Sequence, residues 1–338
     1  MQQDKFQDRE NHLLDSFKRS ITYLRISITD RCNLRCIYCT PKDGRAKLAF
    51  GELLTYEELL RVVSIAVRLG INKVRLTGGE PLVRRNVLSF IRRLTAIPGL
   101  KDIRLTTNGT YLTDFSRDLY KAGIRKLNIS LDTLNPDRYK QISGADLFSK
   151  VWSGIQDVKE RGFQPVKINM VVMRGVNDDE LLDFGRLSID EPFQVRFIEF
   201  MPIGEKTSWA RERYVPTEEL KERLESLGRL SPVKTGSMEG PAKVYRFDGA
   251  AGALGFISPI SHRFCDKCNR LRLTSEGGLR SCLLVDRETD LKAILRSGGS
   301  DDDIKNAFIQ TILNKPKGHT LQEGNPVNCH GWMSRIGG

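Results

Sequence analysis

From about residue 21 to residue 200, short β-branched stretches alternate with longer amphipathic stretches. In the longer stretches, apolar residues recur every three to four positions, as on one face of a helix. The stretches that read as strands are 21–29, 73–77, 102–107, 125–131, 165–172 and 193–200. Those that read as helices are 55–70, 84–96, 113–122, 135–141, 147–161 and 178–188. This order predicts βα units around a parallel sheet.

The number of repeats and a later change of rhythm predict the domain organisation. Six repeats fit an incomplete (β/α)6 barrel, although an open doubly wound sheet has the same periodicity. Both architectures collect ligands at the carboxyl ends of their strands. Beyond about residue 230, strand-like pieces at 242–247, 254–260 and 270–274 precede helical stretches near 287–297 and 300–313. We therefore expect a partial barrel over 1–230 and a smaller α+β domain over 231–338.

Composition and charge narrow the class of protein. The 338 residues are 39% hydrophobic and 28% charged, which is typical of a soluble globular protein. No apolar run is long enough to cross a membrane, and the N-terminus lacks the apolar core of a signal peptide, so we expect a cytoplasmic protein. The net charge of +12 favours an anionic partner, or forms a solvated basic surface. Because the basic residues form no dense run, we expect a small polyanion such as a nucleoside triphosphate rather than nucleic acid.

The first group of cysteines directly follows the first expected strand. The segment TDRCNLRCIYC (29–39) places Cys32, Cys36 and Cys39 in a C-x3-C-x2-C spacing. Three thiolates can hold three corners of a cubane iron–sulfur cluster and leave the fourth iron open. An open coordination site is what a catalytic metal centre needs. The alternative is a three-cysteine zinc site with a remote fourth ligand.

A second group of cysteines lies in HRFCDKCNRLRLTSEGGLRSC (262–282), where Cys265, Cys268 and Cys282 have a C-x2-C-x13-C spacing. His262 precedes this group by three residues, so a structural Cys3His zinc site is chemically reasonable. A redox-active C-x-x-C pair is a further alternative. From this segment alone these options stay open. Cys329 stands apart, and we interpret it as a free structural or incidental thiol.

Several motifs together resemble a known family. The C-x3-C-x2-C spacing with Tyr38 before its last cysteine, and TGGEP at 77–81 after the second strand, are similar to the hallmarks of the radical S-adenosylmethionine (SAM) superfamily. With TTNG at 106–109, C-x2-C-N-R-x-R, a third downstream cysteine and a terminal Gly337–Gly338 pair, the chain resembles the GTP 3′,8-cyclases of molybdenum cofactor biosynthesis. The resemblance runs from about residue 20 to the C-terminus and implies a partial (β/α)6 barrel.

The resemblance implies two [4Fe–4S] clusters as cofactors, one on each group of cysteines. SAM would bind the open iron of the first cluster, and the guanine of GTP would contact the open iron of the second. His262 would then not be a ligand. Cleaved SAM would yield a 5′-deoxyadenosyl radical that abstracts the ribose 3′ hydrogen. The ribose 3′ carbon would then attack C8 of guanine, which gives 3′,8-cyclo-7,8-dihydro-GTP.

The resemblance also assigns site residues. The catalytic set is Cys32, Cys36, Cys39, Arg270 and Arg272. The SAM contacts are Tyr38, Gly79, Ser130 and Met201. The GTP contacts are Arg25, Arg75, Thr106, Lys167, Arg270, Leu271 and Arg272. The sequence contains no G-x4-G-K-[ST] phosphate loop, so scattered Arg and Lys side chains must bind the triphosphate, for which the planar fork of arginine is suited.

The residues themselves add one independent argument. Arg270 and Arg272 alternate with Leu271 and Leu273, so on a strand both arginines would point to the same face. The final Gly337–Gly338 pair can enter a crowded cavity, or it can be a frayed end.

The family resemblance implies partners as well. An external one-electron reductant would supply the first cluster, and a cyclic pyranopterin monophosphate synthase would act on the product. A homodimer is compatible with the resemblance. One rival is a peptide-modifying radical SAM enzyme with an auxiliary cluster. A second rival, a basic nucleic-acid-binding protein with a zinc module, leaves C-x3-C-x2-C and TGGEP unexplained.

Overall fold

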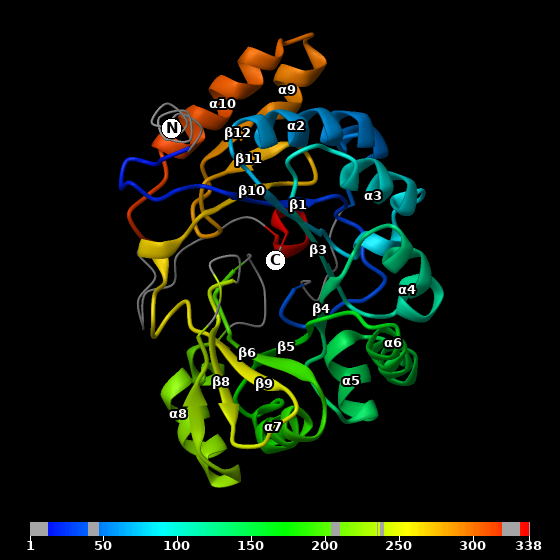
Figure 1. Ribbon diagram of the computed structural model, residues 1–338, viewed down its shortest axis with the longest axis vertical. Helices are drawn as coiled ribbons and strands as arrows, with labels where there is room; N and C mark the ends of the chain where they lie inside the picture. The colour runs from blue at the N-terminus through cyan, green and yellow to red at the C-terminus, as the bar shows by residue number, and fades with distance from the viewer. Residues whose placement is uncertain are drawn as a thin grey trace, which may run out of the picture.

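The computed structural model describes residues 13–39, 47–203, 210–234, 236, 240–319 and 332–337 (Figure 1). Within them, one sheet has the strand order β12-β11-β10-β1-β2-β3-β4-β5-β6-β9-β8-β7. Its centre consists of six parallel strands, which confirm the six expected ones. These are β1 (Tyr23–Ser27), β2 (Lys73–Thr77), β3 (Asp102–Thr107), β4 (Lys126–Ser130), β5 (Val166–Val172) and β6 (Phe193–Glu199).

The order of the central strands decides between the two expected architectures. A doubly wound sheet reverses its strand order at a switch point, whereas β1 to β6 follow one another in sequence order. Because crossovers between parallel strands are right-handed, consecutive order places every connecting helix on one face. Figure 1 shows these helices around the outside of a curved, open sheet. The incomplete barrel is therefore confirmed.

The connecting helices agree with the expected ranges to within a few residues. They are α2 (Tyr56–Arg68), α3 (Val87–Thr95), α4 (Leu112–Lys121), α5 (Pro136–Ser143), α6 (Phe148–Glu160) and α7 (Leu181–Asp190). At the start of α2, the Thr55 hydroxyl accepts from the Glu58 N–H at 3.1 Å, and the Glu58 carboxylate accepts from the Thr55 N–H at 2.7 Å. This is the expected capping box. No described helix is long and apolar enough to cross a membrane.

The C-terminal segment extends both edges of the same sheet. Strand β9 (Ala253–Ile257) pairs in parallel with β6, and β10 (Arg270–Leu273) pairs in parallel with β1. The outer strands are β7 (Leu230–Pro232), β8 (Lys243–Phe247), β11 (Gly278–Arg280) and β12 (Glu288–Asp290). The remaining helices are α8 (Thr217–Leu224), α9 (Leu291–Arg296), α10 (Asp301–Leu313) and α11 (Met333–Ile336). The expected helix at 287–297 starts only at Leu291, because 288–290 pair with β11.

The two faces of the central strands differ in chemistry. One set of alternating residues, including Leu24, Leu76 and Ile129, is fully buried in the core against the helices. The other set points to the concave face and is mostly polar or charged; Arg25 and Arg75 belong to it, with Val171 and Ile198 as apolar members. The strands therefore enclose a buried interior that is lined with polar side chains.

Candidate active site

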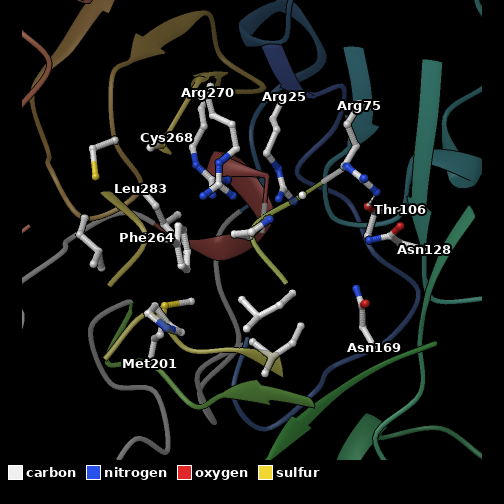
Figure 2. Close-up of a pocket in the computed structure, with 18 of the residues that line it drawn as sticks. Arg25, Arg75, Thr106, Asn128, Asn169, Met201, Phe264, Cys268, Arg270 and Leu283 are labelled. Carbon is white, nitrogen blue, oxygen red and sulfur yellow. Dashed lines mark hydrogen bonds between the residues drawn. The ribbon is translucent and has the colours of Figure 1, made fainter. Parts of the chain in front are cut away.

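A cavity of about 250 Å³ lies inside the concave face, between the central strands and the loops of the C-terminal segment. Figure 2 shows Arg25, Arg75 and Arg270 entering it from one side, with Asn169 and Met201 opposite. Most of the predicted site residues come together here. Those that line the cavity are Arg25, Tyr38, Arg75, Thr106, Ser130, Met201, Cys265, Cys268, Arg270, Arg272 and Cys282.

The other predicted residues are not among the described lining. Lys167 is 1% exposed and lies on β5 in register with Asn128, which does line the cavity. The side chain of Leu271 is fully buried in the hydrophobic core, on the face opposite Arg270 and Arg272. Leu271 could therefore approach a ligand only through its backbone. Gly79 and the three cysteines of the first group lie in neighbouring loops.

Positive charge dominates the cavity. Its described lining contains five arginines and one carboxylate, that of Asp132; the arginines are Arg25, Arg75, Arg196, Arg270 and Arg272. Arg25 is in register with Arg75 on one side and with Arg272 on the other. Burial and the charges of Arg75 and Arg270 lower the pKa of Arg25 to about 10. Burial and the charges of Arg25 and Arg270 lower the pKa of Arg272 well below its usual value. A polyanion would relieve this mutual repulsion.

Tyr23 belongs to the same basic cluster, although the sequence analysis did not single it out. Its hydroxyl accepts from Arg75 Nε at 2.5 Å, and Arg75 Nη1 donates to Thr106 Oγ1 at 3.2 Å (Figure 2). Burial opposes ionisation of Tyr23, but Arg75, Arg25 and Lys73 together lower its pKa to about 7. The cavity can thus place an ionisable phenol beside its cations near neutral pH.

The first group of cysteines occupies the loop after β1. The Leu34 N–H and the Asn108 amide donate to Cys32 Sγ, at 3.4 and 3.7 Å. Burial raises the pKa of Cys32 to about 11, with contributions from the charges of Glu80 and Cys39. Burial, the Asp132 carboxylate and the other two thiolates raise the pKa of Cys36 as well. A bound cation would stabilise the thiolate forms of these cysteines, and an iron–sulfur cluster fits this set of three sulfur donors.

TGGEP fastens this cysteine loop to the next strands. A Cβ on Gly78 would lie 2.5 Å from the Thr29 carbonyl oxygen, and one on Gly79 would lie 2.2 Å from that of Arg31. Only glycine therefore permits this approach of the two backbones. Glu80 is fully buried and accepts from Thr107 Oγ1 at 2.9 Å and from the Asn108 N–H at 2.7 Å. Glu80 thus ties TGGEP to TTNG, a function that the motif spacing did not reveal.

Asp132 orients Tyr38, which lies between Cys36 and Cys39 of the first group of cysteines. The Tyr38 hydroxyl donates to Asp132 Oδ2 at 2.7 Å, and Asp132 Oδ1 accepts from the Val171 N–H at 2.9 Å. Burial raises the pKa of Asp132 to about 6. Asp132 belongs to none of the motifs in the sequence. Its position two residues after Ser130, at the carboxyl end of a strand, is a signal that would have found it.

The second group of cysteines lies in a more basic environment. Burial opposes ionisation of Cys268, but the charges of Arg270 and Lys315 lower its pKa to about 6. The Lys315 ammonium donates to the Arg270 carbonyl oxygen at 2.9 Å and to that of Ser281. Lys315 thereby connects the strand that carries Arg270 to the loop that carries Cys282. Neither sequence motif contained this residue.

His262 bears on the zinc alternative at these cysteines. Its Nε2 is paired with the Glu218 carboxylate, so Nδ1 is the ring nitrogen that a metal ion could bind. A single zinc ion draws its ligand sulfurs in to about 2.3 Å from the metal. Over the residues that the structure describes, no three His, Cys, Asp or Glu side chains are grouped for one metal ion. A cubane binds each thiolate through a different iron atom, so it does not need such a compact group.

The C-terminal helix α11 lies within the ring of strands (Figure 1). Ser27 Oγ donates to the Ser334 carbonyl oxygen at 3.1 Å, and Arg272 Nη1 donates to that of Gly337. Ile336 is 1% exposed and packs in a small apolar cluster with Ile203 and Leu284. The tail therefore reaches the basic cavity as far as Gly337, while Gly338 and Cys329 lie outside the described residues.

Further lining residues were not predicted. They include Asn128, Asn169 and Arg196 on the strands, together with Phe264, whose ring faces the Arg270 guanidinium at 5.1 Å. Polar residues at alternating positions of β4, β5 and β6 are the signal that would have found the first three. Phe264 comes from an irregular loop, where no periodicity indicates the direction of a side chain.

Comparison with known proteins places these features in a family. Residues 26–187 match the family model described as Radical SAM superfamily, and residues 193–321 match the one described as Molybdenum Cofactor Synthesis C. The chain is 49% identical to a GTP 3′,8-cyclase of Thermodesulfovibrio yellowstonii, over 96% of this chain and 99% of that protein. It is 48% identical to a GTP 3′,8-cyclase of Pelotomaculum thermopropionicum, with the same coverage of both chains.

Solved structures support the fold. SuiB of Streptococcus suis bound to S-adenosylmethionine matches with a TM-score of 0.58 at 15% identity, over 86% of this chain and 68% of that one. SuiB bound to the precursor peptide SuiA matches with a TM-score of 0.60 at 14% identity, over 93% and 68%. At such low identity the likeness establishes the radical SAM fold alone.

Proposed function

Because the chain belongs to the GTP 3′,8-cyclase family, we propose that its arginine-lined cavity binds GTP between two iron–sulfur centres. The protein is a radical SAM enzyme that converts GTP to 3′,8-cyclo-7,8-dihydro-GTP, the first step of molybdenum cofactor biosynthesis. It uses SAM and an iron–sulfur cluster. The observation that carries the proposal is the crowding of five arginines around one cavity with a single carboxylate in its described lining.

We place the triphosphate at the row formed by Arg75, Arg25 and Arg272, whose registers set them side by side. Arginine forks bind phosphate oxygens through charge-assisted hydrogen bonds. Arg270 lies beside Cys268, at the end of this row of arginines. With the triphosphate on the row, we propose that the guanine points towards the second group of cysteines. Thr106, held by Arg75, belongs to the polar wall around the nucleotide. We also propose Lys167 and the backbone of Leu271 as GTP contacts, from positions just behind the described lining.

We propose that Cys32, Cys36 and Cys39 hold the first cluster, which when bound supplies the electron that cleaves SAM. Tyr38, fixed by Asp132, would lie beside SAM, and so would Ser130 and Met201, which line the same cavity. Gly79 would offer its backbone to the amino group of SAM. The loops from TGGEP and TTNG keep the cysteine loop in place for this task.

We also propose a second [4Fe–4S] cluster on Cys265, Cys268 and Cys282. The low pKa of Cys268 favours the thiolate that iron requires. In this proposal residues 1–230 form the SAM-cleaving half and residues 231–338 form the half that carries the second cluster.

We further propose that the enzyme is cytoplasmic, receives electrons from an external one-electron reductant, binds no nucleic acid, and passes its product to a cyclic pyranopterin monophosphate synthase. A homodimer is compatible with this scheme.

Metal analysis of protein purified without oxygen tests the two-cluster proposal. Two cubanes require about eight iron and about eight sulfide per chain. Half of these amounts, or stoichiometric zinc, would overturn the second cluster. Calorimetric titration with GTP and with guanosine tests the arginine site independently, because it does not depend on SAM cleavage.

A further inference from the structure

A second cleft adjoins the first cysteine loop, and it shares no described lining residue with the substrate cavity. It has a volume of about 560 Å³, and its lining includes Cys32. Cys32 is not among the described residues that line the substrate cavity. The cleft therefore reaches a ligand of the proposed first cluster without using any described residue of the substrate cavity.

The rim of this cleft is basic. Arg31, Lys47, Arg84 and Arg85 all line it. Two of them are stacked on aromatic rings: the Arg31 guanidinium lies 3.8 Å from the centroid of Phe50, and that of Arg84 lies 4.1 Å from the centroid of Tyr56. The four cations are therefore presented on a partly rigid surface rather than on freely moving chains.

Nearby carboxylates are already engaged elsewhere. Glu57 pairs with Arg93 at 2.6 Å, Glu58 with Arg296 at 3.0 Å, and Glu52 with Lys292 at 2.6 Å. In the part of the chain that the structure describes, no ion pair involves any of the four rim cations. Arg84 also donates to the carbonyl oxygens of Ile28 and Leu54, so the exposed Lys47 and Arg85 offer the most accessible charge to an external acidic surface.

An apolar side chain stands at the edge of the cleft. Phe50 is 75% exposed, more than any other large hydrophobic residue of the described chain. An exposed aromatic ring surrounded by cations suits contact with another protein, since a small inorganic anion would gain nothing from the ring. The cleft therefore combines charge and apolar area next to a cluster ligand.

We infer that this cleft docks the reductant, a small acidic protein that carries one electron at low potential. The inference rests on the proposed cluster at Cys32, Cys36 and Cys39. One electron leaves the reduced carrier and enters the cluster, and the oxidised carrier then dissociates. The acidic face of such a carrier complements the four cations, and the lining by Cys32 gives the electron a short path that avoids the substrates.

The test reverses two exposed rim charges that are outside the proposed catalytic and binding machinery. Lys47→Glu/Arg85→Glu is compared with Arg117→Glu/Lys305→Glu, a pair on the exposed faces of α4 and α10. Each substitution changes the charge by two, so both double variants lower the net charge of +12 by four. Purified flavodoxin serves as the acidic carrier, and dithionite serves as a reductant that needs no docking.

Two measurements are made on each protein. Calorimetry gives the affinity for oxidised flavodoxin, and anaerobic formation of 5′-deoxyadenosine gives the rate with reduced flavodoxin or with dithionite. At low salt, the rim variant should bind flavodoxin about 10–100-fold more weakly and show a KM for it raised to the same extent. Its rate with dithionite should equal that of the wild type. The control pair should resemble the wild type in every measurement.

Several results would overturn the inference. Unchanged flavodoxin affinity in the rim variant would do so, as would an equal loss in the control pair, which would show a net-charge effect. A third variant, Phe50→Ser, should weaken flavodoxin binding about fivefold without a change in salt dependence. If charge reversal weakens flavodoxin binding and Phe50→Ser does not, the carrier is held by charge alone and the part assigned to the ring is wrong. Absence of dithionite-driven SAM cleavage in the wild type would contradict the proposed function, while the calorimetric comparison would still decide on the docking site.

Discussion

Substitution of Gly337 tests whether the C-terminal tail acts in the cavity. Gly337 has φ +79°, and a Cβ there would lie 2.6 Å from Thr77 Cγ2 and 3.5 Å from Ser27 Cβ. In Gly337→Ala, the left-handed backbone costs about 1–2 kcal/mol, and the overpacked methyl group costs about 1–3 kcal/mol more. The tail is held by one charge-assisted hydrogen bond from Arg272, which contributes about 1.5–3 kcal/mol, and by the burial of Ile336, which contributes a similar amount.

The cost of the substitution is thus comparable to the free energy that holds the tail in place. A loss of about 2–5 kcal/mol shifts the ratio of docked to displaced tail by about 30–4,000-fold. We expect Gly337→Ala to retain both clusters and SAM cleavage, and to form much less cyclised GTP per 5′-deoxyadenosine. Removal of Gly337 and Gly338 should have the same effect. The assay is anaerobic turnover with SAM and GTP, with both products separated by chromatography.

Gly298→Ala is the matched control, because Gly298 has φ +81° and nothing lies within 4 Å of an added Cβ. Gly298→Ala bears the same backbone strain as Gly337→Ala, but it causes no clash and does not lie at the cavity. Its yield of cyclised GTP per 5′-deoxyadenosine, the coupling, should therefore equal that of the wild type. Wild-type coupling in Gly337→Ala would refute a role for the tail. An equal loss in Gly298→Ala would show that the effect is general destabilisation.

Three further predictions concern the cavity and the clusters. Cys36→Ala should abolish SAM cleavage, whereas Cys268→Ala should still form some 5′-deoxyadenosine without cyclised GTP; complete loss in a folded Cys268 variant that keeps the first cluster would contradict separate roles. Arg272→Ala should bind GTP about 10–100-fold more weakly in calorimetry, since one charge-assisted contact contributes about 1.5–3 kcal/mol, and guanosine should bind the wild type poorly; equal affinities for guanosine and GTP would refute the phosphate site. Because the pKa of Tyr23 is lowered to about 7, GTP affinity should fall as the pH rises through 7 and the phenolate repels phosphate, and Tyr23→Phe should remove that step; an unchanged profile in the variant would exclude Tyr23 as its cause.

Local patterns in the sequence determined the strands and helices of this protein and its two groups of cysteines. All six central strands were predicted from runs of β-branched residues, and the capping box of Thr55 and Glu58 from its spacing. The alternation of Arg270 and Arg272 with leucines predicted that both arginines share a face, and both line the cavity. These features were accessible because strand period, helix caps and cysteine spacing depend on residues only a few positions apart.

Only the tertiary structure decided which distant residues meet. Tyr38 and Asp132 are 94 positions apart, and Arg272 and Gly337 are 65 positions apart. The curvature of the sheet brings the loops after β1 and β4 together, and the position of α11 inside the sheet brings Gly337 to Arg272; no local periodicity encodes either arrangement. The tertiary structure also decides how deep a side chain lies relative to the cavity. Lys167 and Asn169 share one face of β5, yet only Asn169 is among the described residues that line the cavity. A polar residue on an inward face can contact the ligand or lie beneath its neighbours. Which of the two occurs depends on how far the strands curve and on what the C-terminal segment covers. Packing across the whole sheet sets both, so neither can be read from a local pattern.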